Sequence, residues 1–370
     1  MITDILVIAI AYSLAGAYVT AVTKARLLVG RLPVDPYLLM LLSMVVLGLV
    51  LPARGSSQHL VNGLAYAAVS GLFFLYGARL APSAIWAGLV NWRLQGLVFA
   101  STFLLFLAIG LIVGHIAKPY LPAALVSGLV FLTLLPSTVQ SSIAFTSIAR
   151  GDVPAALCSA SFSNVVGVVL TPLLASLAFT GRHGLPAGSL EDIGLQILLP
   201  FALGQAARPF IGGWLERHHL VTNIFDRGSI LVIVYSAFSE GSAAGVWRLI
   251  SAADLGAVLA LDLVMLGAVI ATTMFASRWL GFSTKEEIAI VFCGSKKSMA
   301  SGLPMANILF SGHVAGLIVL PLMIFHQAQL FVCASLARRY ARRIDDSKTD
   351  QASNFARQPI ERRTLEKSSL

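Results

Sequence analysis

Apolar stretches of about 20 residues recur along almost the whole chain, and they restrict its fold more than any other feature. Such a stretch crosses the bilayer core as a helix, because backbone groups in hydrocarbon must find their partners within the segment. Charged residues make up only 12% of the 370 residues, about half the share of an average globular domain. The sequence therefore predicts an all-α polytopic membrane protein with ten transmembrane helices. They lie near residues 35–52, 59–78, 94–116, 122–149, 153–179, 190–213, 225–242, 253–277, 284–310 and 313–337.

Both ends of the chain lie outside this ten-helix unit. Residues 1–32 form an N-terminal extension in which 5–22 are apolar. That stretch is either an extra helix or the sign of a start assigned too early, and it lacks the basic leader of a signal peptide. Residues 341–370 are polar and are expected to be a disordered cytoplasmic tail. Nine of the 26 Lys and Arg lie at or after Arg338, which suits contact with anionic lipid and not with nucleic acid.

The loops between the predicted spans differ in positive charge. With residue 35 inside, the inner loops carry eight basic residues, whereas the outer loops carry four. The positive-inside rule then predicts a cytoplasmic C-terminus and a location in the inner (plasma) membrane. The inner set is Arg79, Arg93, Arg150, Arg208, Arg217, Arg227, Arg278 and Lys285, and the outer set is Arg54, Lys118, Arg182 and Arg248.

The ten spans divide into two groups of five, residues 35–179 and 190–340. Because five is odd, a repeated unit of five helices enters the membrane in the opposite direction the second time, which is the inverted-repeat plan of secondary transporters. The fourth span of each group contains a polar cluster. The first cluster follows Pro136 and comprises Ser137, Thr138, Gln140, Ser141 and Ser142; the second, before Pro304, comprises Ser295, Lys296, Lys297 and Ser298. Interrupted spans at matching positions predict a binding site near the midplane.

The two adjacent lysines are the strongest sign of function. Lys296 and Lys297 have about ten residues of span on either side, too far for their ammonium groups to reach the interface. A charge at such depth costs about 3 kcal/mol and by default marks a functional site.

Other polar residues in the spans have two interpretations each. Ser161 and Asn164 belong to a polar patch that either lines the site or permits close helix packing. Glu240 and Asp262 are charge partners for a lysine, or they face an interface or cavity. His326 is a proton relay or a packing histidine. The three cysteines are apolar packing residues, since their spacing fits neither a disulfide framework nor a zinc site. No catalytic motif is present, so we do not expect an enzyme.

Two long motifs carry a family resemblance. The stretches LLPSTVQSSIAFTSIARGDVPAALCSASFSN and VFCGSKKSMASGLPMANILF, followed by VLPLMIFHQAQL, resemble the bile acid:sodium symporter superfamily. They are most similar to its bacterial branch, which is related to the seventh member of the human bile-acid carrier family. The resemblance implies a panel domain from spans 1, 2, 6 and 7 and a core domain from the remaining six. Within the core, the broken fourth and ninth spans would cross at the substrate and ion sites.

The sequence departs from this family at one place. Sodium-coupled relatives have an acidic residue and a Gln or Asn in the ninth-span crossover. Here residues 292–298 contain no carboxylate, and Lys296 and Lys297 occupy the ligand region. The resemblance implies a sodium site near Ser141 and Ser142, but a lysine ammonium in the same pocket would repel the ion.

We therefore expect a secondary transporter that works by alternating access and moves a small organic anion across the lipid bilayer. It is expected to need no cofactor, and Na⁺ or H⁺ remains open as the coupling ion. One or both lysines are expected to replace sodium as a tethered cation. The alternative is a membrane regulator or scaffold that keeps the carrier fold without substantial transport.

Overall fold

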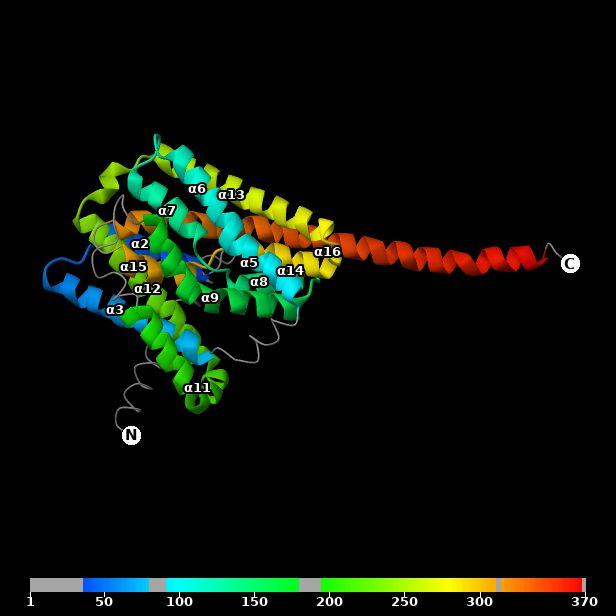
Figure 1. Ribbon diagram of the computed structural model, residues 1–370, viewed down its shortest axis with the longest axis horizontal. Coiled ribbons are helices and arrows are strands. Elements are labelled where there is room, and N and C mark those ends of the chain that lie inside the picture. The colour runs from blue at the N-terminus through cyan, green and yellow to red at the C-terminus, as the bar shows by residue number, and fades with distance from the viewer. Residues whose placement is uncertain (1–35, 80–90, 180–193, 311–313, 368–370) are drawn as a thin grey trace.

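The computed structural model describes residues 36–79, 91–179, 194–310 and 314–367, and all regular elements in these ranges are helices (Figure 1). The predicted all-α fold is therefore confirmed. The first half contains α2 (Pro36–Val50), α3 (Ser56–Arg79), α5 (Trp92–Phe99), the π-helical turn η1 (Ala100–Leu105), α6 (Phe106–Ala117), α7 (Ala123–Thr133), α8 (Val139–Ile148) and α9 (Val153–Phe179). The apolar stretch 5–22, for which the sequence predicts an extra helix or a start assigned too early, lies outside the described residues.

The second half begins with a short π-helical turn and ends in the longest helix. It contains η2 (Gly194–Leu198), α11 (Leu199–Arg217), α12 (His219–Ala243), the 3₁₀ turn η3 (Val246–Leu249), α13 (Ala252–Trp279), α14 (Thr284–Gly294), α15 (Met299–Leu309) and α16 (Ala315–Lys367). The expected helical span 284–310 is thus two helices with a break between them, and so is the span 122–149.

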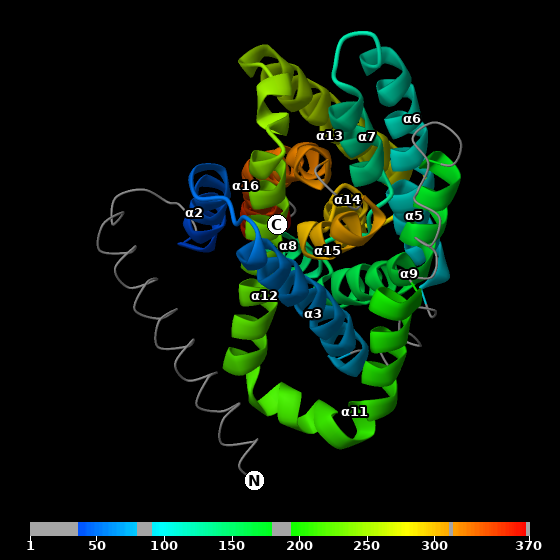
Figure 2. The same cartoon turned by 90° about the vertical axis from the view of Figure 1, so that its left-hand side faces the viewer.

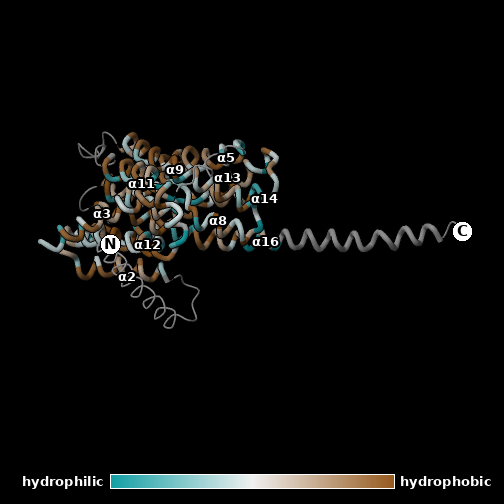
Figure 3. Tube along the Cα trace, turned by 90° about the horizontal axis from the view of Figure 1, so that it is seen from below, coloured by the Kyte–Doolittle hydropathy of each residue, from teal (hydrophilic) through white to brown (hydrophobic). Residues whose placement is uncertain are grey.

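Among the described residues, six helical stretches are long and apolar enough to cross a bilayer, judged by length and composition. They are Ser56–Arg79, Trp92–Ala117, Val153–Phe179, Leu220–Ala243, Ala252–Trp279 and Ala315–Arg342. Leu39–Val50 and Ala123–Thr133 are shorter apolar helices. Many large apolar side chains are exposed, and apolar residues run along most of the helices in Figure 3. Phe210 is 87% exposed and Phe275 71% exposed, which is expected where lipid and not water is the solvent.

Helix α16 differs from the expectation for the C-terminal tail. The sequence predicts disorder over 341–370, whereas α16 continues as helix as far as Lys367 and projects away from the other helices (Figure 1). Propagating an existing helix adds one hydrogen bond per residue without the penalty of nucleation. The preceding apolar helix therefore supplies the nucleus that an isolated tail would lack.

The helices pack as two groups. α2, α3, α11 and α12 contact mainly one another, and the remaining helices form the larger group (Figure 2). Within the smaller group, α3 and α11 come into backbone contact. A Cβ atom on Gly77 would lie 2.0 Å from the carbonyl oxygen of Phe201, and one on Gly204 would lie 1.9 Å from that of Phe74. Only glycine permits this approach. α12 connects the groups through its contacts with α15 and α16.

Several loops meet at one end of the larger group. The guanidinium of Arg93 donates to the carbonyl oxygen of Leu280 at 2.9 Å, and the N–H of Asp152 donates to the carbonyl oxygen of Lys285 at 3.0 Å. The loops around residues 93, 152 and 280–285 therefore share one end, as the predicted inner loops should.

Candidate functional site

The two polar clusters of the sequence are breaks between helices. Break 1 comprises residues 134–138, between the end of α7 and the start of α8. Break 2 comprises residues 295–298, between α14 and α15. Pro136 has no N–H and cannot continue a helical ladder. In break 2, Ser298 caps α15, since its hydroxyl accepts from the N–H of Ser301 at 3.2 Å. Both breaks that the sequence predicts are therefore present.

The breaks contact each other. The N–H of Ser298 donates to the carbonyl oxygen of Pro136 at 2.8 Å. The hydroxyl of Ser137 donates to the carbonyl oxygen of Cys293 at 2.6 Å, and that of Ser142 donates to the carbonyl oxygen of Phe292 at 2.9 Å. The last two carbonyls belong to the end of α14, where intrahelical donors are missing. First-half serines thus satisfy the end of a second-half helix.

Lys297 holds the centre of this contact. It is fully buried, and its Nζ donates to the carbonyl oxygens of Thr102 at 2.6 Å, Thr133 at 2.8 Å and Leu135 at 2.8 Å. The ammonium also lies 4.1 Å from the ring centroid of Phe106, within the range of a cation–π interaction. One ammonium therefore connects break 2 with η1, the end of α7 and break 1, and all three of its protons have acceptors.

Lys296 has a different environment although it is also fully buried. Its Nζ has no hydrogen-bond partner in the described part of the chain. It lies 4.1 Å from the ring centroid of Phe145 and 5.3 Å from that of Phe292, and both rings belong to an apolar cluster with Cys333 and Tyr340. The two lysines therefore do different things: Lys297 is bound by carbonyl oxygens, and Lys296 lies on aromatic rings.

Helix α9 supports break 1. The N–H of Ser137 donates to the hydroxyl of Ser163 at 3.0 Å. The amide of Asn164 donates to the carbonyl oxygen of Ser137 at 2.6 Å and accepts from the hydroxyl of Ser301 at 3.0 Å. A Cβ on Gly167 would lie 2.6 Å from Cβ of Pro136. The fifth-span patch thus lines the break and also permits close packing.

Helix α16 supports break 2 through one buried amide. Oε1 of Gln329 accepts from the N–H of Lys297 at 2.9 Å, and Nε2 donates to the carbonyl oxygen of Lys297 at 3.1 Å. Nε2 also lies 3.0 Å from Nδ1 of His326. His326, which the sequence marks as a relay or packing residue, is therefore one hydrogen bond away from the amide that holds Lys297.

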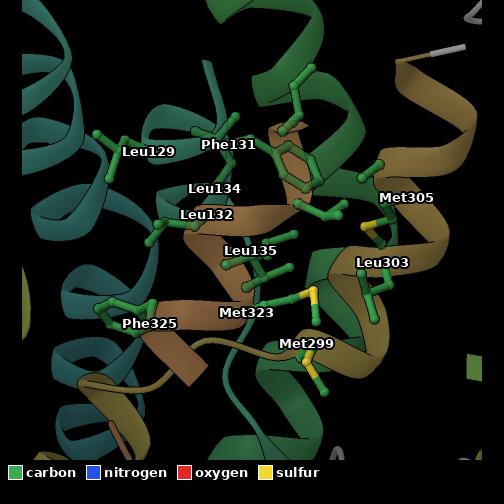
Figure 4. Packing of buried hydrophobic residues seen from close by; sticks show 14 of the residues in the cluster. Leu129, Phe131, Leu132, Leu134, Leu135, Met299, Leu303, Met305, Met323 and Phe325 are labelled. Carbon is green, nitrogen blue, oxygen red and sulfur yellow. The ribbon is translucent and has the colours of Figure 1, made fainter. Parts of the chain in front are cut away.

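An apolar cluster surrounds the breaks. Figure 4 shows residues of α7, break 1, α15 and α16 converging there, with Leu135 beside Met323 and Leu303. Leu135 occupies the space that the missing side chain of Gly302 leaves, since a Cβ on that glycine would lie 2.5 Å from Cδ1 of Leu135. The polar contacts are thus enclosed by close packing, which excludes water.

Some predicted site residues lie apart from these contacts. Gln140 is exposed on α8, and the hydroxyl of Ser141 donates to that of Thr138 at 3.0 Å instead of reaching break 2. The hydroxyl of Ser295, in break 2, donates back to the end of α14, to the carbonyl oxygen of Val291 at 2.6 Å. Ser161 is half-buried on α9 and makes none of the polar contacts described for the two breaks.

The two carboxylates that the sequence predicts as partners of a lysine also lie away from the contacts between the breaks. Asp262 is fully buried on α13, and neither of its oxygens has a partner among the described residues. Glu240 lies half-buried near the end of α12. The ion pairs in the described ranges join other residues, Arg79 to Asp226 and Arg278 to Glu287. Neither Glu240 nor Asp262 therefore neutralises a lysine in this structure.

Sequence reasoning missed the groups that bind Lys297. Three of them are backbone carbonyls, which no side-chain pattern marks. Thr102 lies in the π-helical turn η1, a feature frequent at functional sites but without a signature in the sequence. Gln329 had a signal, since it is a polar residue within the apolar last span.

The site does not fit a bound sodium ion. A hard cation needs several oxygen ligands, but Lys297 occupies the carbonyl oxygens of Thr102, Thr133 and Leu135. The hydroxyls of Ser137 and Ser142 donate to backbone carbonyls. No group of three or more His, Cys, Asp or Glu that could hold a metal occurs within the ranges that the structure describes.

Two broken helices that meet inside an apolar helical protein define a membrane transporter, in which irregular backbone at membrane depth is tolerated because protein surrounds it. Comparison with known proteins identifies the family. Residues 35–342 match the SBF-like CPA transporter family, so the chain belongs to it. It is thus a multi-pass membrane transporter related to the bile acid:sodium symporters, and not an enzyme.

Relatives from bacteria and vertebrates agree with this family. The chain is 48% identical to the uncharacterized protein PA2026 of Pseudomonas aeruginosa over 317 residues, which cover 85% of this chain and 95% of that one. It is 46% identical to a protein named putative symporter YfeH of Escherichia coli, with coverages of 86% and 97%. It is 28% identical to the sodium/bile acid cotransporter 7 of Mus musculus, with coverages of 73% and 80%.

Proposed function

We propose that this protein is a secondary active transporter that carries a small organic anion by alternating access and uses Lys297 where sodium-coupled relatives bind a cation. The observation that carries the proposal is the set of three carbonyl oxygens around the Lys297 ammonium. These oxygens come from two segments of the chain, η1 and the junction of α7 with break 1, and a cation bound among them holds both segments to break 2. The Lys297 ammonium is covalently part of the chain, so it holds these segments without an ion gradient.

The helix bounds support ten spans in two inverted repeats. Each half contributes a fourth span that is broken near its middle, and the two breaks contact each other. The grouping of α2, α3, α11 and α12 supports the panel domain that the resemblance implies, and the larger group supports the core. Alternating access then consists of movement of the core against the panel, with the crossing moving as a unit because it is internally bonded.

An organic anion is the substrate class that suits these residues. The chain has a formal net charge of +9, and both midplane lysines lack a carboxylate partner among the described residues. The mouse relative is named for bile acids, which are amphipathic organic anions. A transported anion would supply the negative charge that the crossing lacks.

Contacts between loops support one membrane orientation. The contacts of Arg93 with Leu280 and of Asp152 with Lys285 place three predicted inner loops at one end. We propose that this end, together with the C-terminal half of α16, faces the cytoplasm and that the protein resides in the inner (plasma) membrane.

The proposal is tested in proteoliposomes. Organic anions, bile acids first, are screened by thermal shift of the purified protein, because a bound ligand raises apparent stability. Uptake of a labelled hit is then measured with and without Na⁺. We expect uptake that is independent of Na⁺ and is lost in Lys297→Gln while the protein stays folded. Strict sodium dependence would contradict the proposal.

A regulator or scaffold that keeps the carrier fold is the rival function. It predicts that no screened anion is transported and that Lys297→Gln leaves the physiological effect of the protein unchanged. The extensive bonding at the crossing favours a carrier, because a scaffold needs no ammonium at membrane depth.

A further inference from the structure

Gln329 and His326 form a short hydrogen-bonded chain that ends on the backbone of Lys297. The Gln329 amide meets both polar backbone groups of Lys297, at 2.9 Å and 3.1 Å, and its nitrogen also meets Nδ1 of His326 at 3.0 Å. Gln329 is fully buried, and His326 is half-buried. A proton can therefore reach the histidine more easily than the amide.

The chemistry of these groups fixes the direction of every bond. The peptide N–H of Lys297 can only donate, so the amide oxygen of Gln329 must face it. The amide nitrogen then faces the carbonyl oxygen of Lys297 and Nδ1 of His326. Because this nitrogen can only donate, Nδ1 must carry no proton. The observed geometry therefore requires neutral His326 with its proton on Nε2.

Protonation of His326 would disrupt this arrangement. A proton on Nδ1 would place two N–H groups against each other. Rotation of the Gln329 amide would relieve that conflict, but it would turn the NH₂ group toward the N–H of Lys297. The rotated amide would keep neither its bond to the N–H nor its bond to the carbonyl oxygen of Lys297, and the ammonium of the same residue holds the crossing of the two breaks.

We propose that His326 is the proton-responsive residue of the crossing. It is a positioning residue: acting through Gln329, it holds the backbone of Lys297 in place. The inference rests on the proposed function, since it gives the transporter its coupling proton. Neutral His326 keeps Gln329 hydrogen-bonded to the Lys297 backbone, an arrangement we call the latch. Protonated His326 releases these bonds. A proton that binds one state better than the other shifts the equilibrium between them.

The helices that pack against α16 carry other charged or titratable groups, and the test must separate these from His326. Helices α7, α8 and α15 pack against α16 and contain no titratable side chain. On α12, Asp226 pairs with Arg79, Arg227 lies over the ring of Tyr37, Tyr235 donates to the carbonyl oxygen of Leu51, and Glu240 lies near the helix end. α13 carries Asp254, Asp262 and Arg278, and break 2 carries the two lysines.

The test is the pH dependence of thermal stability of the purified full-length protein between about pH 5 and 8, where histidine ordinarily changes charge. The neutral form is the one that is latched, so stability should be present at high pH and lost as the pH falls. His326→Gln, which keeps a polar side chain but cannot be protonated, should lose less stability on acidification than the wild type. His115→Gln is the matched control, because His115 is exposed on α6, and its pH dependence should equal that of the wild type.

Gln329→Glu keeps the test decisive if His326→Gln does not fold. Its carboxylate accepts from the N–H of Lys297 but cannot donate to neutral His326, and it favours protonated imidazole. Acidification should then destabilise this variant less than the wild type, or stabilise it. Equal pH slopes for wild type and both variants would overturn the inference.

Transport is measured separately. The pH dependence of uptake should flatten in His326→Gln and stay unchanged in His115→Gln; unchanged dependence in His326→Gln overturns the coupling role. If no variant transports but the stability difference appears, the latch stands and the proposed function fails.

Discussion

Lys296 and Lys297 are adjacent in the chain, but their ammonium groups lie against different residues: carbonyl oxygens and Phe106 for Lys297, Phe145 and Phe292 for Lys296. Nζ of Lys297 is bound by three carbonyl oxygens, whereas Nζ of Lys296 lies 4.1 Å from the Phe145 ring centroid and has no acceptor among the described residues. Both side chains are fully buried. The same residue type therefore contributes differently to stability at the two positions.

Methionine substitutions should separate the two lysines. Lys297→Met leaves three buried carbonyl oxygens without their donor, and each lost partner costs about 1–3 kcal/mol, so we expect a loss of about 3 kcal/mol or more. Lys296→Met removes a buried ammonium that has no acceptor and replaces it with an apolar chain of similar length, a change that is often neutral or stabilising. Thermal unfolding in detergent measures both. Equal losses would contradict our description of the site.

A pair of glycine substitutions tests the contact between α9 and break 1. Gly167→Ala would place its methyl 2.6 Å from Cβ of Pro136, and overpacking of this kind costs about 1–3 kcal/mol. Gly267 on α13 has open space at the corresponding position, so Gly267→Ala should be neutral or stabilise by up to about 1 kcal/mol. Denaturation of the two variants under identical conditions gives the comparison. A tolerated Gly167→Ala would show that the break can move away from α9.

Asp262 gives a third prediction, because both its oxygens lack partners in the described ranges. Burial without a partner disfavours a charged carboxylate. Asp262→Asn keeps the shape of the carboxylic acid and removes the charge, so we expect unchanged or higher thermal stability. Asp254 is the control, because its carboxylate accepts from the N–H of Ser251 at 2.7 Å and caps α13. Asp254→Asn should be destabilising, because it weakens the capping box that Asp254 forms with Ser251.

The sequence predicts the helical class and both breaks because these depend on local signals. Span length follows from apolar runs, and Pro136 and the lysines mark the interruptions. The contact between Ser298 and Pro136 could be expected only from matching positions in the two halves and from the family resemblance. The structure adds the hydrogen bond itself.

The partners of Lys297 could not be predicted in the same way. Carbonyl oxygens occur at every residue, and which ones lack an intrahelical donor depends on where each helix ends. The shift of α5 into a π-helical turn at Thr102 is an outcome of packing, and no residue type there requires it. Gln140 is the converse case: its polarity predicts a ligand, and the structure places it on an exposed side of α8, away from the contacts between the two breaks.

The direction of the chain across the membrane is the last prediction. Single cysteines at positions 54 and 248 should react with a membrane-impermeant maleimide added outside intact cells. Those at 217 and 285 should react only after the cells are permeabilised. All four positions hold a basic residue, and the predicted inner loops carry eight basic residues against four in the outer loops, a bias that keeps the richer set in the cytoplasm. The Lys285 carbonyl bonds to Asp152, so a cysteine at 152 should match position 285.

The native Cys158, Cys293 and Cys333 are half-buried or buried, and the protein without added cysteines measures their background. Labelling of all positions from one face would contradict the ten-span arrangement, whereas an exact exchange of the two groups would keep the spans and reverse the orientation.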